Sequence, residues 1–187
     1  MKLADIATIN TGFLFRSRFV HQDAGEYQVI QVKDITVDNT LDDTSLERVD
    51  LKSVKDYHLV RKGDILFRSR GQQNLALVVE NKLEKAIVVS QFFIIRVKGQ
   101  KILPKYLAWY INQRPAQQYL VQAAAGTGTK HINMRNLEKL EIVVPQLEIQ
   151  RKIVDIKALA MRENQIINQL QKKKDILLQA LLLQKIS

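Results

Sequence analysis

The sequence contains no cysteine, and its 187 residues include only seven glycines and three prolines. Without cysteine, disulfides, thiolate nucleophiles and cysteine-ligated metals are excluded. The three histidines, His21, His58 and His131, lie far apart and lack metal-ligand spacing, so we expect no metal site. There is no run of about 18 apolar residues, and the first residues lack the apolar stretch of a signal peptide. We therefore expect a cytoplasmic protein without a membrane partner.

Acidic residues are scarce in one part of the chain. Overall, 29 lysines and arginines against 19 aspartates and glutamates give a net charge of +10. Residues 61–139 hold 14 basic and 4 acidic residues, a balance of +10, whereas residues 20–60 hold 4 basic and 9 acidic residues, a balance of −5. A concentrated positive charge favours a polyanionic partner, above all nucleic acid, although many basic proteins have only a solvated surface.

Short strands and helices are predicted within residues 1–145. Runs rich in β-branched residues predict strands at 27–37, 64–70 and 137–144, and two strands within 76–97 joined by a polar hairpin turn at 81–85. Two helices are predicted, one starting at Pro104 and one at Pro115 that ends at Gly126. A hydrophobic content of 46% suffices for one core. The expected fold is α+β, a mixed-sheet domain with packed helices.

The period changes in residues 146–187, which predict one long helix. Alternating steps of four and three residues give a heptad seam of eight apolar and three polar residues. At 1.5 Å per residue, about 40 residues make a rod of roughly 60 Å, which needs a partner helix. The alternative is a helix that folds back on its own domain. The predicted dimer interface is Ile149, Ile153, Ile156, Ala160, Ile167, Leu170, Leu177 and Leu181.

The segment "FRSRGQQNLA" carries the side chains best suited to reading bases. Arg68 and Arg70 alternate with Phe67 and Ser69, so both guanidinium groups would lie on one face of a strand. Arginine pairs with guanine edges in the major groove, and glutamine or asparagine pairs with adenine edges. The alternative is a solvated strand edge, where arginine discourages aggregation. The candidate DNA-reading residues are Arg68, Ser69, Arg70, Gln72, Gln73 and Asn74.

A second candidate is the loop "GTGTKH" at residues 126–131. It does not match a nucleotide-binding P-loop, because Thr129 follows Gly128 and His131 follows Lys130. Its amides could approach phosphate oxygens where glycine leaves room, or it could be a plain connection. The candidate phosphate contacts are Arg16, Arg18, Thr129, Lys130, His131 and Arg135; near the first two, Phe13, Phe15 and Phe19 could instead be core.

No catalytic apparatus is predicted. Asp64 with Glu80 and Lys82 imitates the carboxylate and lysine arrangement of metal-dependent nucleases, but Asp64 follows a glycine at a strand entry and Glu80 begins the predicted turn. Neither a glycine-rich cofactor loop nor an Asn/Asp-Pro-Pro-aromatic segment of a methyltransferase is present. We therefore expect a non-catalytic protein that itself holds no cofactor.

Four segments together resemble the specificity subunit of type I restriction-modification enzymes: "RKGDILFRSRG", "VVSQFFIIRV", "PKYLAWYIN" and "GTGTKHINMRNLEKLEIVVPQLEIQRKIV". The resemblance implies a target-recognition domain that reads half of a bipartite DNA site, followed by a spacer helix from about Pro145. It also implies docking of a methyltransferase subunit and a restriction subunit, which would carry S-adenosylmethionine, ATP and magnesium.

The chain is about half the length of such a subunit, with one recognition domain and one helix instead of two of each. An antiparallel homodimer through residues 147–186 would rebuild the two-domain layout and would read an inverted repeat. Two rival functions remain: a coiled-coil adaptor that does not bind DNA, and a nuclease that needs Asp64.

Overall fold

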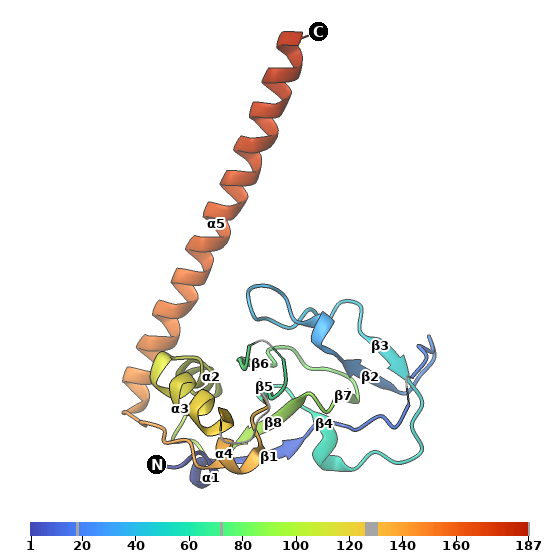
Figure 1. Ribbon diagram of the computed structural model, residues 1–187, viewed down its shortest axis with the longest axis vertical. Coiled ribbons are helices and arrows are strands. Elements are labelled where there is room, and N and C mark those ends of the chain that lie inside the picture. Colours follow the sequence, from blue (N-terminus) through green and yellow to red (C-terminus); the bar gives the residue numbers. More distant parts are fainter. Residues whose placement is uncertain (18, 72, 126–130, 187) are drawn as a thin grey trace. The chain divides into compact units, whose positions relative to one another are not determined.

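The computed structural model describes residues 1–17, 19–71, 73–125 and 131–186 (Figure 1). The chain divides into two compact units, Met1–Leu147 and Glu148–Ser187. The second unit belongs to one helix, α5 (Leu147–Ile186). The first unit contains, in chain order, α1 (Leu3–Ile6), β1 (Ala7–Thr11), β2 (Tyr27–Ile30), η1 (Val32–Asp34), β3 (Glu47–Val49), η2 (Asp56–His58), β4 (Leu59–Val60), β5 (Ile65–Arg68), β6 (Ala76–Val78), β7 (Ala86–Val88), β8 (Phe92–Val97), α2 (Pro104–Ile111), α3 (Arg114–Ala125) and α4 (Met134–Glu138).

The strands form two four-stranded sheets. The first, in the order β1-β8-β5-β6, is antiparallel throughout, with Phe67 opposite Phe93 in the pairing of β5 with β8. The second, in the order β3-β2-β7-β4, is mixed, because β2 and β7 run parallel with Val29 opposite Ile87. The α+β class with packed helices and a long C-terminal helix is therefore confirmed.

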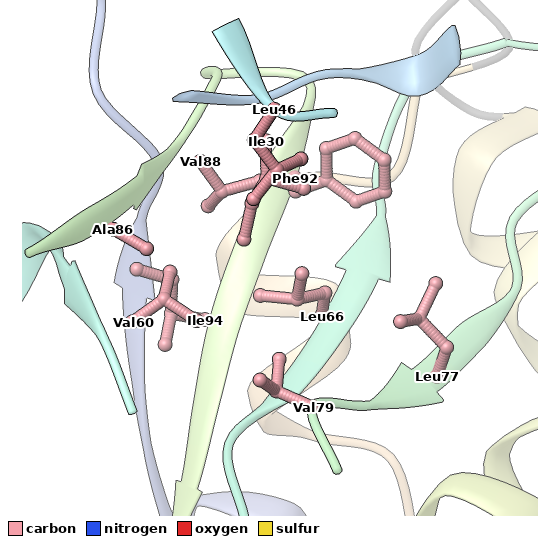
Figure 2. Packing of buried hydrophobic residues seen from close by; sticks show 10 residues of the cluster. All are labelled: Ile30, Leu46, Val60, Leu66, Leu77, Val79, Ala86, Val88, Phe92 and Ile94. Carbon is pink, nitrogen blue, oxygen red and sulfur yellow. The ribbon is translucent and has the colours of Figure 1, made fainter. Parts of the chain in front are cut away.

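One apolar core joins the two sheets (Figure 2). Ile30 and Val88 come from the second sheet, while Leu66 and Ile94 come from the first, and all four are wholly buried. Each such side chain contributes about 1.5–3 kcal/mol relative to an exposed position. On the other face of the second sheet, Val29, Val49 and Ile87 are covered by a smaller cluster that includes Phe13, Phe15 and Phe19. Consecutive residues of the second sheet thus face different clusters, as the two-residue period requires.

The predicted hairpin at residues 81–85 is wrong. β6 and β7 lie in different sheets, where β6 pairs with β5 and β7 lies between β2 and β4. All three residues of β7 are buried, and Val88 belongs to the shared core whereas Ile87 belongs to the smaller cluster. A strand covered on both faces is more stable in the interior of a sheet, so β7 pairs centrally in the second sheet.

The predicted strand at residues 137–144 is also wrong. Its first part lies in α4, which begins because the Asn133 side chain accepts a hydrogen bond of 2.8 Å from the Asn136 amide. The rest pairs briefly with the chain start: the amide of Leu3 donates to Leu140 and the amide of Ile142 donates to Met1. Leu140 and Ile142 are buried, as in a strand, but only one isolated bridge forms, between Lys2 and Glu141.

The two predicted helices correspond to α2 and α3. α2 begins at Pro104, where proline fits the first turn because it has no amide hydrogen to pair. α3 begins at Arg114, one residue before Pro115, and ends at Ala125; Gly126 lies outside the described residues.

α5 runs from Leu147 to Ile186 without a break. Its predicted seam residues Ile156, Ile167 and Leu177 are 54–67% exposed. Nothing in the described part of the chain is a helix long and apolar enough to cross a membrane.

Candidate nucleic-acid interface

The basic loop, defined here as residues 68–74, continues from the end of β5. Phe67 and Ser69 are wholly buried, Arg68 is half-buried and Arg70 is exposed. Burial alternates over residues 67–70, so Arg68 and Arg70 lie on the opposite face of the chain from Phe67 and Ser69. The buried residues Phe67 and Ser69 therefore fix the backbone from which the side chains of Arg68 and Arg70 extend.

Arg68 folds back across the basic loop. Its Nε donates a hydrogen bond of 3.1 Å to the carbonyl oxygen of Arg70. Gly71 makes this possible in two ways: its φ is +120°, and a Cβ at this position would lie 2.6 Å from Nη2 of Arg68. A glycine is needed where the backbone is left-handed and a side chain crosses so closely.

Ser69 and Asn74 hold the basic loop from inside. The Ser69 hydroxyl donates to the carbonyl oxygen of Gln91 over 2.9 Å, and Ser69 is wholly buried. The Asn74 side-chain amide donates to the carbonyl oxygen of Arg68 over 3.0 Å. The carbonyl oxygen of Asn74 in turn accepts from Gln117 on α3. These contacts give Ser69 a role in holding the basic loop, and they occupy the side-chain NH2 group of Asn74. Gln73 remains exposed.

The structure brings His131 next to the basic loop. Arg70 and His131 form an isolated antiparallel bridge. Beside it, the carbonyl oxygen of Ser69 accepts a hydrogen bond of 3.0 Å from the amide of Ile132 and lies 3.0 Å from Nδ1 of His131. Arg70 and His131, which are far apart in sequence, thus lie side by side.

Arg135 follows on the first turn of α4 and is exposed. The position of α4 is fixed by Asn136, whose side-chain amide donates to the carbonyl oxygen of Ala123 over 2.9 Å. The Tyr119 hydroxyl of α3 donates to the carbonyl oxygen of Asn136 over 3.2 Å. α3 and α4 are therefore tied together on either side of residues 126–130.

Arg16 belongs to a different part of the first unit. It is exposed and lines a hollow with Phe13, Phe15 and Phe19, which pack against the second sheet. The rings of Phe13 and Phe15 meet edge to face with centroids 5.0 Å apart, as in a core. The other candidates, Arg18, Gln72, Thr129 and Lys130, lie outside the described residues.

Asp64 is occupied by a structural ion pair. Arg96 binds its carboxylate at both oxygens, with Nε 2.8 Å from Oδ1 and Nη2 2.7 Å from Oδ2, and the amide of Arg61 also donates to Oδ2. The side-chain hydrogen bond to Asp64 raises the pKa of Arg96 above its usual value. No group of three His, Cys, Asp or Glu residues among those described is placed to hold a metal ion. The carboxylate of Asp64 is therefore committed to the fold.

Several residues that hold the basic loop were missed by sequence reasoning. Gln91 accepts from Ser69, Gln117 donates to Asn74, and Asn112 bonds both the amide and the carbonyl of Ala76 in β6. Gln91 acts through its backbone carbonyl oxygen, and Gln117 and Asn112 through their side-chain amides. All three contact residues that are distant in sequence, so no local pattern marks them. Asn133 did carry a signal, because asparagine is a preferred N-cap residue.

Residues 1–176 match the protein family described as the type I restriction modification DNA specificity domain. The chain belongs to this family. A specificity subunit of the type I restriction enzyme HindI, from Haemophilus influenzae, is 26% identical over 155 residues, which cover 81% of this chain and 29% of that subunit.

Solved structures with a similar fold are known. A chain from a structural study of complex assembly and conformational transition of the type I R-M system superposes with a TM-score of 0.70 at 18% identity, over 96% of this chain and 42% of that one. The HsdS subunit of Thermoanaerobacter tengcongensis superposes with a TM-score of 0.58 at 17% identity, over 88% of this chain and 38% of that subunit. This specificity-domain chain thus spans less than half the length of these relatives.

Proposed function

We propose that the chain is a non-catalytic DNA recognition module that reads one half of a bipartite site. The observation that carries this proposal is the antiparallel bridge between Arg70 and His131. It joins the basic loop to His131, in a chain that belongs to the DNA specificity domain family. The excess of 14 basic over 4 acidic residues in 61–139 supports the same partner.

The side chains divide by chemistry. Arg68 and Arg70 can each pair bidentately with a guanine edge, and Gln73 has the amide that pairs with adenine. Gln72 is assigned to the same task from the sequence alone. His131 and Arg135 are assigned to backbone phosphates. Arg16, Arg18, Thr129 and Lys130 complete the proposed phosphate contacts, and Arg16 would reach DNA only from beside the second sheet.

The second part of the proposal is assembly. Two copies pair through α5 as an antiparallel homodimer, so that two recognition domains read an inverted repeat. The exposure of Ile156, Ile167 and Leu177 supports it, since an apolar seam this exposed favours a partner helix. The dimer docks a methyltransferase subunit and a restriction subunit, and S-adenosylmethionine, ATP and magnesium belong to these partners.

Selection of binding sites from a pool of randomised DNA duplexes tests the first part. The parent chain should enrich a defined sequence. The Arg68→Ala/Arg70→Ala variant should lose about 2–6 kcal/mol of specific binding, because each bidentate base contact contributes about 1–3 kcal/mol. Arg61→Ala/Lys62→Ala is the matched control, because it removes the same charge at the other end of β5, and it should enrich the same sequence as the parent. Loss of enrichment in both variants, or in neither, would contradict the assignment of the basic loop.

A further inference from the structure

Two charged residues interrupt the apolar seam of α5. Glu163 and Lys174 occupy seam positions, and both are exposed. On the helix surface, the neighbours three and four residues away are Leu159, Ala160, Ile166 and Ile167 for Glu163, and Leu170, Gln171, Leu177 and Leu178 for Lys174. Neither forms an ion pair with a residue that the structure describes, whereas Glu148 and Lys152 of the same helix pair at 2.7 Å. Each is a charge in largely apolar surroundings.

Pairing two copies of α5 places these charges at the helix interface. A buried charge without a partner costs several kcal/mol, so the favoured pairing is the one that satisfies both residues. A parallel pair in register fails, because Glu163 would face Glu163 of the second copy and Lys174 would face Lys174. An antiparallel pair can bring opposite charges together.

The seam positions of a coiled-coil helix form two alternating sets. In an antiparallel pair, each set of one helix packs against the other set of its partner. Steps of four and three residues assign Glu163 to the class of Ile156, Leu170 and Leu177, and Lys174 to the class of Ala160 and Ile167. Glu163 can therefore face Lys174 of the second copy directly. Displacing one helix by a heptad would instead bury Glu163 against Ile167 and Lys174 against Ile156.

We propose that Glu163 and Lys174 select the orientation and register of the α5 homodimer by forming two symmetric ion pairs across it; this inference rests on the dimer proposed above. The register also packs the small Ala160 against Leu177 and places two Ile167–Leu170 contacts at the centre, one on each side of the two-fold axis. Ile156 faces Leu181. Every charged seam residue then has an oppositely charged partner, which the heptad-displaced pairing does not provide.

Charge reversal tests the ion pairs. Glu163→Lys alone and Lys174→Glu alone place like charges opposite each other, and each should weaken dimerisation of the full chain by about tenfold or more. The double variant should restore the parent affinity, measured by sedimentation equilibrium. Lysine and glutamate have similar helix propensities, so the helix itself is preserved. Single reversals without effect would overturn the inference. In a parallel pair like charges already face each other, and in the heptad-displaced pair Glu163 does not face Lys174, so in neither arrangement would a reversal break an ion pair.

Cysteine cross-linking tests the register, and the absence of native cysteine makes it direct. Ala160→Cys/Leu177→Cys should form intermolecular disulfides under mild oxidation, whereas the control Ala160→Cys/Leu170→Cys should not. Within one helix these positions are too distant to cross-link. Efficient cross-linking of the control alone would overturn the register and leave the DNA-reading dimer standing. A chain that is monomeric by light scattering would overturn the dimer as well.

Discussion

Gly71 shows how much of the proposed interface depends on one missing side chain. A Cβ on residue 71 would lie 2.6 Å from Nη2 of Arg68, so the guanidinium would have to move, and the φ of Gly71 is +120°. The Arg68 guanidinium is thus oriented by its hydrogen bond to the backbone of the basic loop. A methyl group at this position would change both the backbone conformation of residue 71 and the position of the Arg68 guanidinium.

Gly71→Ala should therefore weaken DNA binding more than it weakens the fold. Alanine at a left-handed φ costs about 1–2 kcal/mol of stability, and the new Cβ displaces Arg68. The matched control is Gly99→Ala, whose φ is +68° but whose Cβ would meet nothing within 4 Å. Thermal unfolding should show a loss for both variants, larger for Gly71→Ala because its φ of +120° lies outside the left-handed range of about +50 to +70°, and DNA titration should show a loss for Gly71→Ala only. Equal DNA affinities would mean that the position of Arg68 does not matter.

Asp64 is the second residue whose role the structure redefines. Asp64→Asn should lower the free energy of unfolding by about 3 kcal/mol, because it leaves Arg96 without its carboxylate partner. Asp56→Asn is the control: the pair of Asp56 with Arg61 is exposed and should contribute about 0–1 kcal/mol. Urea denaturation measures both. Magnesium-dependent DNA cleavage that disappears in Asp64→Asn would instead revive the nuclease hypothesis.

At the scale of elements, β6 is an edge strand that is protected by side chains. Asn112, directly after α2, donates to the carbonyl oxygen of Ala76 and accepts from its amide, both over 2.8 Å. Asn39 donates to the same carbonyl oxygen. The two amides replace the partner strand that an open edge would otherwise recruit. They also fix the end of the basic loop, which enters β6 two residues after Asn74.

Asn112→Leu should lower the free energy of unfolding by about 1–3 kcal/mol, because the buried amide of Ala76 loses its acceptor. Asn112→Asp turns a carboxylate oxygen toward the carbonyl oxygen of Ala76, which is repulsive, but it keeps the acceptor for the buried amide and Asn39 still donates to the carbonyl, so its cost should be smaller. Chemical denaturation ranks the two variants. The reverse ranking would show that the size of residue 112, and not its hydrogen bonds, holds α2 against β6.

Elements that are determined by neighbouring residues could be predicted from the sequence, and elements that depend on contacts distant in sequence could not. α2 and α5 were predicted close to their observed starts, because a proline in the first turn and a seam of regular period are signals within a few residues. The predicted β6–β7 hairpin was wrong because β7 joins the second sheet, which buries Ile87 on one face and Val88 on the other. The position of β7 therefore depends on contacts with β2 and β8, which the local sequence does not show. The bridge between Arg70 and His131 likewise depends on the buried Ser69, which local pattern cannot reveal.

At the scale of the whole molecule, the proposed dimer converts the length of α5 into a distance between two DNA-reading domains. Inserting seven residues after Asn168, with isoleucine and leucine at the seam positions, should keep the seam in phase. The heads should move apart by about 10.5 Å. Half-sites at the new distance would lie about three base pairs further apart, since the rise is about 3.4 Å per base pair, so site selection should no longer enrich the parent gap. An unchanged gap would show that α5 does not set the spacing.

The continuity of α5 over 40 residues has a further consequence for evolution of the target site. DNA turns once in about 10–10.5 base pairs, so three added base pairs rotate one half-site by roughly 105° about the duplex axis. A dimer displaced by one heptad would therefore present its second domain to the wrong side of the double helix, and would fail outright instead of reading a relaxed site. New gap lengths then become accessible only when a change in length is accompanied by a compensating twist between domain and helix.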